Sequence, residues 1–273
     1  MATQGEYAKT KINAVNRYRG RGKYDHETIH ALVNSVPVLH VSFNVPLPDD
    51  DDESGISYPT ILPMIGCMSN YRSPGSISAP QADNDNDNSD EPPVLYLHGY
   101  ISSRLIKQGG TNTGLPMSIA ATSLDGLVLA LTPNHHSCNY RSAVLFGRAT
   151  LVSDESERMR AMQLITENML PNRWNNSRVP PTKVEMQSTG ILRVEIDAAS
   201  AKTRTGGPGE DRADLKDEAL RERVWTGVVP VSLQWGEPVP AEGNRVDKVP
   251  GYVEEWRVGS NAEAVKASTD SAS

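Results

Sequence analysis

Short runs of alternating apolar residues, each ended by glycine, proline or acidic residues, constrain the fold of this chain most strongly. VLHVSFNVP places Val41, Phe43 and Val45 on one side of an extended segment, and VLYLH and GILRVEI are similarly strand-like. The chain has 21 Gly and 19 Pro but only 5% aromatic residues, which suits a fold with many turns. We therefore predict a mainly β protein, with at least six strands in an antiparallel barrel and short peripheral helices.

Three segments have helical signals instead. Asp25 is the predicted N-cap of a helix in YDHETIHALVNSV, and Asp154 with Glu157 forms a capping-box pattern before a longer helix. SSRLIKQGG predicts a short helix capped by Ser102 or Ser103.

Turn residues predict two further features. In MSIAATSLDGLVLALTP, the pair Asp125-Gly126 fits a tight hairpin turn between two strands. AASAKTRTGGPG is predicted to be a loop, because glycine, proline and small polar residues dominate it.

The composition along the chain predicts one folded domain with extensions. We expect a flexible N-terminal arm over residues 1–22, a domain over 23–236, and a C-terminal extension over 237–273 that ends in a solvated tail. Residues 69–93 are rich in Ser, Pro, Asn and Asp, and we expect a disordered or surface insertion there.

The overall charge excludes some classes of partner. Lys and Arg total 27 against 34 Asp and Glu, so the net charge of -7 gives no general attraction for nucleic acid. No run of 18 apolar residues and no signal-peptide pattern is present, so we expect a cytoplasmic protein without a membrane segment. Cys67 and Cys138 are too few for a disulfide framework or a structural zinc site.

Three basic segments contain no Asp or Glu, namely residues 98–107, 132–152 and 198–209. If the fold brings them together, they form a local positive basin for a phosphorylated small ligand. Arg104 and Lys107, one helical turn apart, are suited to phosphate binding. The alternative is that these residues only solvate the ends of loops.

His135 and His136 are the candidate catalytic residues. Adjacent residues of a strand point to opposite faces, so this pair cannot easily chelate one metal ion, and we predict no metal site. The sequence has no G-x-S-x-G nucleophile elbow, no P-loop and no G-x-G-x-x-G fingerprint. Two interpretations stay open: the histidines deliver a proton, or they cap the strand and bind loop carbonyls.

Several motifs together resemble a known family. YLHGYISSRLIK, SLDGLVLALTPNHHSCNYRSAVLFGRATLV, ASAKTRTGGP and VWTGVVP occur in this order. They resemble the pyridoxamine 5'-phosphate oxidase-related family of FMN-binding split-barrel proteins, and especially its flavin-nucleotide-binding, nitroimidazole-resistance-like branch. The similarity covers roughly Tyr24 to Gly236.

The resemblance implies a six-stranded antiparallel Greek-key split barrel that forms a homodimer and binds FMN at the dimer interface. It also implies a set of cofactor-binding positions, from the phosphate end to the ring. These positions are Pro63, His98, Ser102, Ser103, Arg104, Lys107, Asn139, Tyr140, Arg141, Ser142, Lys202 and Trp225.

The resemblance implies an FMN-dependent oxidoreductase that acts on a small molecule, with NAD(P)H among the electron partners considered. The alternative is a non-catalytic flavin- or heme-binding carrier or regulator. The chain has Ser103-Arg104-Leu105 where the oxidases of pyridoxamine phosphate have Ser-Arg-Lys, and it lacks their C-terminal Arg-Leu-x-Pro signature. Cofactor binding is therefore better supported than vitamin B6 oxidation.

Overall fold

The structure of the protein is a computed structural model. It describes residues 5–44, 58–69, 93–110 and 113–273. Most of the insertion predicted at 69–93 lies outside these residues.

The chain divides into two compact units. The first consists of Met1–Ala121 and Ala143–Ala201, and the second of Thr122–Ser142 and Lys202–Ser273.

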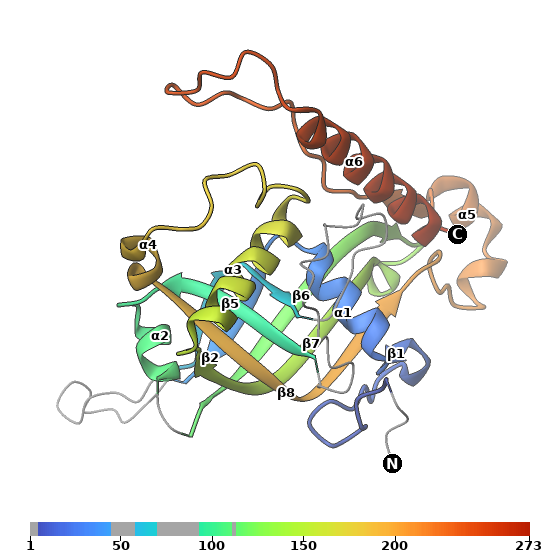
Figure 1. The fold of residues 1–273 in the computed structure, drawn as a ribbon. Helices are drawn as coiled ribbons and strands as arrows, with labels where there is room; N and C mark the ends of the chain where they lie inside the picture. The colour runs from blue at the N-terminus through green and yellow to red at the C-terminus, as the bar shows by residue number, and fades with distance from the viewer. Residues whose placement is uncertain (1–4, 45–57, 70–92, 111–112) are drawn as a thin grey trace. The chain divides into compact units, whose positions relative to one another are not determined.

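The strands of the described residues pair in one sheet (Figure 1). They are β1 (Gly22–Lys23), β2 (Leu39–Phe43), β3 (Thr60–Met64), β4 (Gly66–Met68), β5 (Val94–Tyr100), β6 (Leu115–Leu129), β7 (Ser137–Leu151), β8 (Thr189–Arg204) and β9 (Gly227–Pro230). The order is β3-β2-β6-β7-β8-β5-β4, with β1 beside β8 and β9 beside β6, and it forms an open path among these residues. Pairing is antiparallel between β2 and β3, β2 and β6, β4 and β5, β5 and β8, and β6 and β9, so the predicted mainly antiparallel β fold is confirmed.

Helices and single turns of 3-10 helix connect the strands. They are η1 (Arg19–Arg21), α1 (His26–Ser35), α2 (Arg104–Gly109), η2 (Pro133–His135), α3 (Glu155–Met169), α4 (Lys183–Ser188), η3 (Asp214–Lys216), α5 (Glu218–Arg223) and α6 (Gly251–Ser271). No helix among the described residues has the length and apolar character that a membrane crossing requires.

The predicted helix starts are confirmed. The Asp25 side chain accepts a hydrogen bond from Thr28 N at 2.8 Å, and the Asp154 side chain accepts one from Glu157 N at 2.7 Å. Each bond satisfies an amide that a helix start otherwise leaves free.

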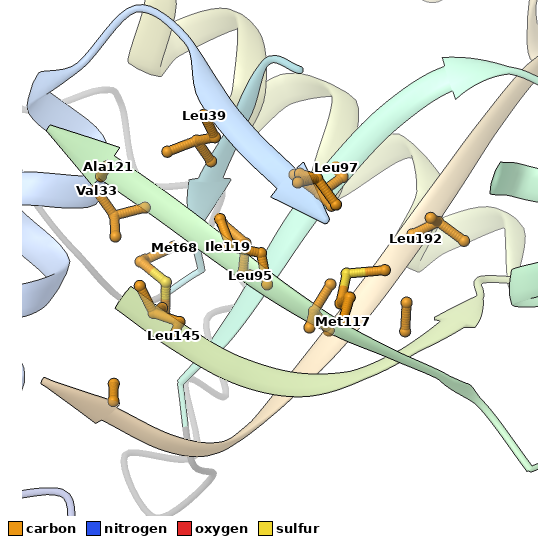
Figure 2. Close-up of a cluster of buried hydrophobic side chains, with 14 of the residues drawn as sticks. Val33, Leu39, Met68, Leu95, Leu97, Met117, Ile119, Ala121, Leu145 and Leu192 are labelled. Atoms are coloured by element: carbon orange, nitrogen blue, oxygen red, sulfur yellow. The ribbon is translucent and has the colours of Figure 1, made fainter. Parts of the chain in front are cut away.

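The core of the first unit is a cluster in which side chains of α1, α2 and the strands converge (Figure 2). Alternate residues of β2 and β6 point into it, and Val41 and Ile119 are completely buried. α1 contributes Ile29 and Val33 to the same cluster. This packing makes the strands a rigid support for the side chains at their ends.

Residues 5–22, for which the sequence predicts an arm, make defined contacts. The buried Asn13 side chain donates to the carbonyl oxygens of Ala8 (3.0 Å) and Ala199 (2.9 Å). The Tyr7 hydroxyl lies 2.8 Å from Nε2 of His30, so this segment packs on α1 and β8.

Two local predictions were wrong. Asp125-Gly126 is not a hairpin turn, because β6 continues through it and Asp125 is buried. AASAKTRTGGPG is not a loop throughout, because β8 extends to Arg204. In both places, pairing with neighbouring strands outweighs the local turn preference.

The predicted solvated tail was also wrong. Residues 251–271 form α6, in which Ser268 and Ser271 are buried. Within the second unit, the preceding segment is tied to α6 by Trp235, whose N and O atoms both bond to the Asn261 side chain at 2.7 and 2.9 Å.

Candidate functional site

In the first unit, α2 presents two cations to solvent. Ser103 is its N-cap and its Oγ accepts from Ile106 N at 3.4 Å, so one of the two predicted caps is identified. Leu105 and Ile106 are buried and anchor the helix, which leaves Arg104 and Lys107 on its exposed side. Within the described part of the chain, neither cation has an ion-pair partner.

Ser102 is exposed immediately before this helix. Because Ser103 Oγ already serves as the cap, the free hydroxyl at the helix start is that of Ser102. Ser102, Arg104 and Lys107 therefore form a donor set suited to an anionic oxygen group.

Pro63 and His98 lie on strands near the same place. A Cβ atom on Gly99 would lie 3.6 Å from Cγ1 of Ile106 and 3.7 Å from Cε of Met64, so the ends of β3 and β5 meet α2 there. Pro63 is exposed, whereas His98 is half-buried and its burial lowers the pKa of the imidazole. The ends of β3 and β5 and the helix α2, each of which carries predicted residues, thus meet within the first unit.

In the second unit, Arg141 on β7 is held by a carboxylate of β6. Its Nε donates to Oδ2 of Asp125 at 2.9 Å and its Nη2 donates to Oδ1 at 2.8 Å. Ser123 completes the network, since its Oγ accepts from Arg141 Nη2 and donates to Asp125 Oδ1, each at 3.1 Å. The hydrogen bond to Asp125 raises the pKa of Arg141 further. The sequence interpretation missed both partners, although Asp125 stands in the quoted motif.

Asn139 is completely buried and its side chain is fully engaged. Nδ2 donates to the carbonyl oxygens of Ser271 at 2.9 Å and Gly206 at 3.2 Å, and Oδ1 accepts from Nη1 of Arg204. In this arrangement Asn139 ties the end of α6 to the segment that follows β8. A direct bond from its side chain to a cofactor would require these contacts to be exchanged.

The two histidines have different partners. His135 Nε2 lies 3.2 Å from Oδ2 of Asp211, and His136 Nδ1 accepts from Ala130 N at 2.9 Å. Glu210, beside Asp211, accepts from Leu131 N through Oε1 at 2.9 Å. Because Nδ1 of His136 is an acceptor, the neutral ring carries its proton on Nε2, which can donate outward.

The remaining predicted residues of this unit are available for contacts. Tyr140, Ser142 and Lys202 are half-buried, and their side chains have no hydrogen-bond partner within the described ranges. Trp225 is 66% exposed and covers Gly227, where a Cβ would lie 2.7 Å from the indole ring. The glycine of the W-x-G motif therefore makes room for the tryptophan.

Several of the basic residues predicted to form a positive basin are neutralised or buried. Arg141 is neutralised by Asp125, Arg148 lies 3.9 Å from Asp197, and Arg204 is buried among carbonyl oxygens. The described residues contain no group of three or more His, Cys, Asp or Glu side chains that could hold a metal ion.

Comparisons with known proteins identify related chains. A family model described as pyridoxamine 5'-phosphate oxidase matches residues 25–203. The flavocytochrome Anf3 from Azotobacter vinelandii is 26% identical, with a TM-score of 0.68 over 90% of this chain and 96% of that one. The FAD and heme binding protein from Mycobacterium smegmatis is 24% identical, with a TM-score of 0.64 over 86% of this chain and 96% of that one. No curated protein matches the sequence significantly.

The family match spans most of the chain and includes the strands that carry the predicted site. It confirms the resemblance drawn from the motifs, and the similar structures confirm the split-barrel fold. The chain belongs to the pyridoxamine 5'-phosphate oxidase family.

Proposed function

We propose that this protein binds FMN and acts as an FMN-dependent oxidoreductase on a small molecule, as a cytoplasmic homodimer. Membership of the family supports flavin binding, and the similar Anf3 chain is described as a flavocytochrome. When bound, the flavin would supply the hydride or electron transfer, so the protein needs no nucleophile of its own.

The observation that carries this proposal is the pair of cations on α2. Arg104 and Lys107 are exposed and lack carboxylate partners among the described residues, while Ser102 adds a free hydroxyl. A phosphate monoester needs such donors, because Arg offers a bidentate fork and Lys a point charge. We assign these three residues to the phosphate of the flavin, and Pro63 and His98 to its surroundings.

The second unit contains the other residues that the resemblance assigns to the cofactor. Tyr140, Ser142 and Lys202 have uncommitted side chains, and Trp225 offers an exposed ring for stacking. His136 is the better placed of the two histidines to give a proton, since its Nε2 is free of protein partners in the described structure.

A non-catalytic flavin- or heme-binding role is the second candidate. It is favoured by the description of Anf3 as a flavocytochrome, because that chain aligns along nearly its whole length. Absorbance spectra separate the candidates: flavin bands that NAD(P)H bleaches and air restores support the enzyme, whereas a Soret band supports heme binding. A flavin that neither nicotinamide reduces would support a binding role.

Substitution of Arg104 tests the phosphate assignment. Arg104→Ala should weaken FMN binding by about 1 to 3 kcal/mol, through loss of a charge-assisted hydrogen bond. Riboflavin, which lacks the phosphate, should bind the variant and the wild type equally. Lys183→Ala, which removes an exposed cation from α4 of the same unit, is the matched control. Unchanged FMN affinity in Arg104→Ala would remove this residue from the site, and parallel titrations with FAD would decide between the two nucleotides.

A further inference from the structure

The ion pair of Asp125 and Arg141 differs from a surface ion pair, because its carboxylate is buried. The Asp125 side chain is only 4% exposed, whereas that of Arg141 is 40% exposed. A buried carboxylate is costly unless it is paired and hydrogen-bonded, and Asp125 satisfies this by binding two nitrogens of one guanidinium. Surface pairs, by contrast, exchange freely with water.

The backbone of Asp125 is fixed as well. Its carbonyl oxygen accepts from Val231 N at 3.0 Å and from Oγ of Ser271 at 3.4 Å. The carboxylate therefore projects from an anchored strand position, and the plane of the Arg141 guanidinium is set by three bonds. Nη1 is the guanidinium nitrogen without a partner among the described residues.

We propose that Asp125 is a positioning residue for the flavin. It orients Arg141 so that Nη1 donates to a neutral oxygen or nitrogen acceptor of the ring or ribityl chain, and it cancels the positive charge at that point. This inference rests on the proposed flavin binding. Because its charge is neutralised by Asp125, Arg141 suits an uncharged acceptor better than an anionic phosphate.

The opposite charges of Asp125 and Arg141 allow a test based on the midpoint potential of the flavin, which a merely structural role would not change in this way. A positive charge near the flavin stabilises its more negatively charged reduced form and raises its midpoint potential. Asp125→Asn leaves the charge of Arg141 uncompensated, so the potential should rise. Arg141→Gln leaves Asp125 uncompensated, so the potential should fall. The double variant should return toward the wild type, because the two changes cancel.

The experiment is a spectroelectrochemical titration of the flavin-loaded full-length protein. Glu218→Gln is the control, since it removes the same charge from an exposed pair with Arg221 in the same unit and should leave the potential unchanged. Opposite shifts for the single variants support the inference. Shifts of the same sign, or no shift while flavin stays bound, would overturn it and leave the proposed function intact. A wild-type protein that takes up no flavin overturns both.

A second variant keeps the inference testable if Asp125→Asn fails to fold. Arg141→Lys keeps the charge but loses the planar fork, so one ammonium group cannot bind Asp125 in two places and also donate to the ligand. Flavin affinity should fall about tenfold, with little change in potential. Unchanged affinity in Arg141→Lys would overturn the assignment of Nη1.

Discussion

The contacts of Asn139 in the structure differ from the role that the family resemblance implies for it. The resemblance assigns its side chain to the cofactor, whereas the structure uses it to join Gly206, Ser271 and Arg204. Asn139→Ala therefore tests which role dominates, because loss of a clamp lowers stability and loss of a ligand contact lowers affinity.

The expected magnitude follows from the bonds that are lost. Asn139→Ala removes two bonds to carbonyl oxygens and one from a charged guanidinium. The Ser271 oxygen keeps a bond from Gly206 N at 2.8 Å, and the Gly206 oxygen keeps one from Arg204 Nη1 at 3.2 Å. No carbonyl is left without a donor, so the loss is close to three net hydrogen bonds, or about 3 kcal/mol of unfolding free energy.

The assay is urea unfolding followed by tryptophan fluorescence. Three of the four tryptophans, Trp225, Trp235 and Trp256, belong to the second unit, so the signal reports mainly on that unit. Asn134→Ala, at an exposed position in η2, is the control and should change stability by less than about 0.5 kcal/mol. A loss below about 1 kcal/mol in Asn139→Ala, together with a large fall in flavin affinity, would refute the clamp and support the family assignment.

Two further predictions concern the two units separately. Gly227→Ala should displace the Trp225 ring, since the new Cβ would lie 2.7 Å from it. The near-UV circular dichroism should change, and the unfolding free energy should fall by about 1 kcal/mol. Gly236→Ala, which has open space around its Cβ position, should show neither effect. Burial and the neighbouring His26 lower the pKa of His30 to about 4. Because the unfolded chain then binds more protons, the contribution of His30 to the unfolding free energy should fall by about 3 kcal/mol from pH 7 to pH 4. The total fall should therefore be smaller in His30→Gln, and equal pH dependence in both proteins would contradict this.

Features that depend on neighbouring residues were predicted well. The caps at Asp25, Ser103 and Asp154 were confirmed because a cap bonds to an amide only three residues away. The alternation in β2 likewise identified Val41 and Phe43 as core residues.

Features that depend on distant partners were not predicted. Asp125-Gly126 has the composition of a turn, but Asp125 is stabilised inside a strand by Arg141, sixteen residues later. α6 was missed because its polar residues surround the helix, so that no apolar stripe predicts it. The helix is held instead by individual hydrogen bonds, such as those between Asn261 and Trp235.

The positive basin was overestimated for the same physical reason. The segment 132–152 contains no acidic residue, yet carboxylates from outside it pair with its basic side chains: Asp125 with Arg141, Asp197 with Arg148 and Asp211 with His135. A stretch without acidic residues in the sequence is therefore not a positive region in space, because strand pairing and loop contacts bring carboxylates from elsewhere in the chain to its basic side chains. Arg104 and Lys107 differ, since they are exposed and remain unpaired within the described structure. The phosphate prediction consequently depends on α2 alone, and that is why Arg104→Ala, rather than a change at Arg141, is the decisive test of flavin phosphate binding.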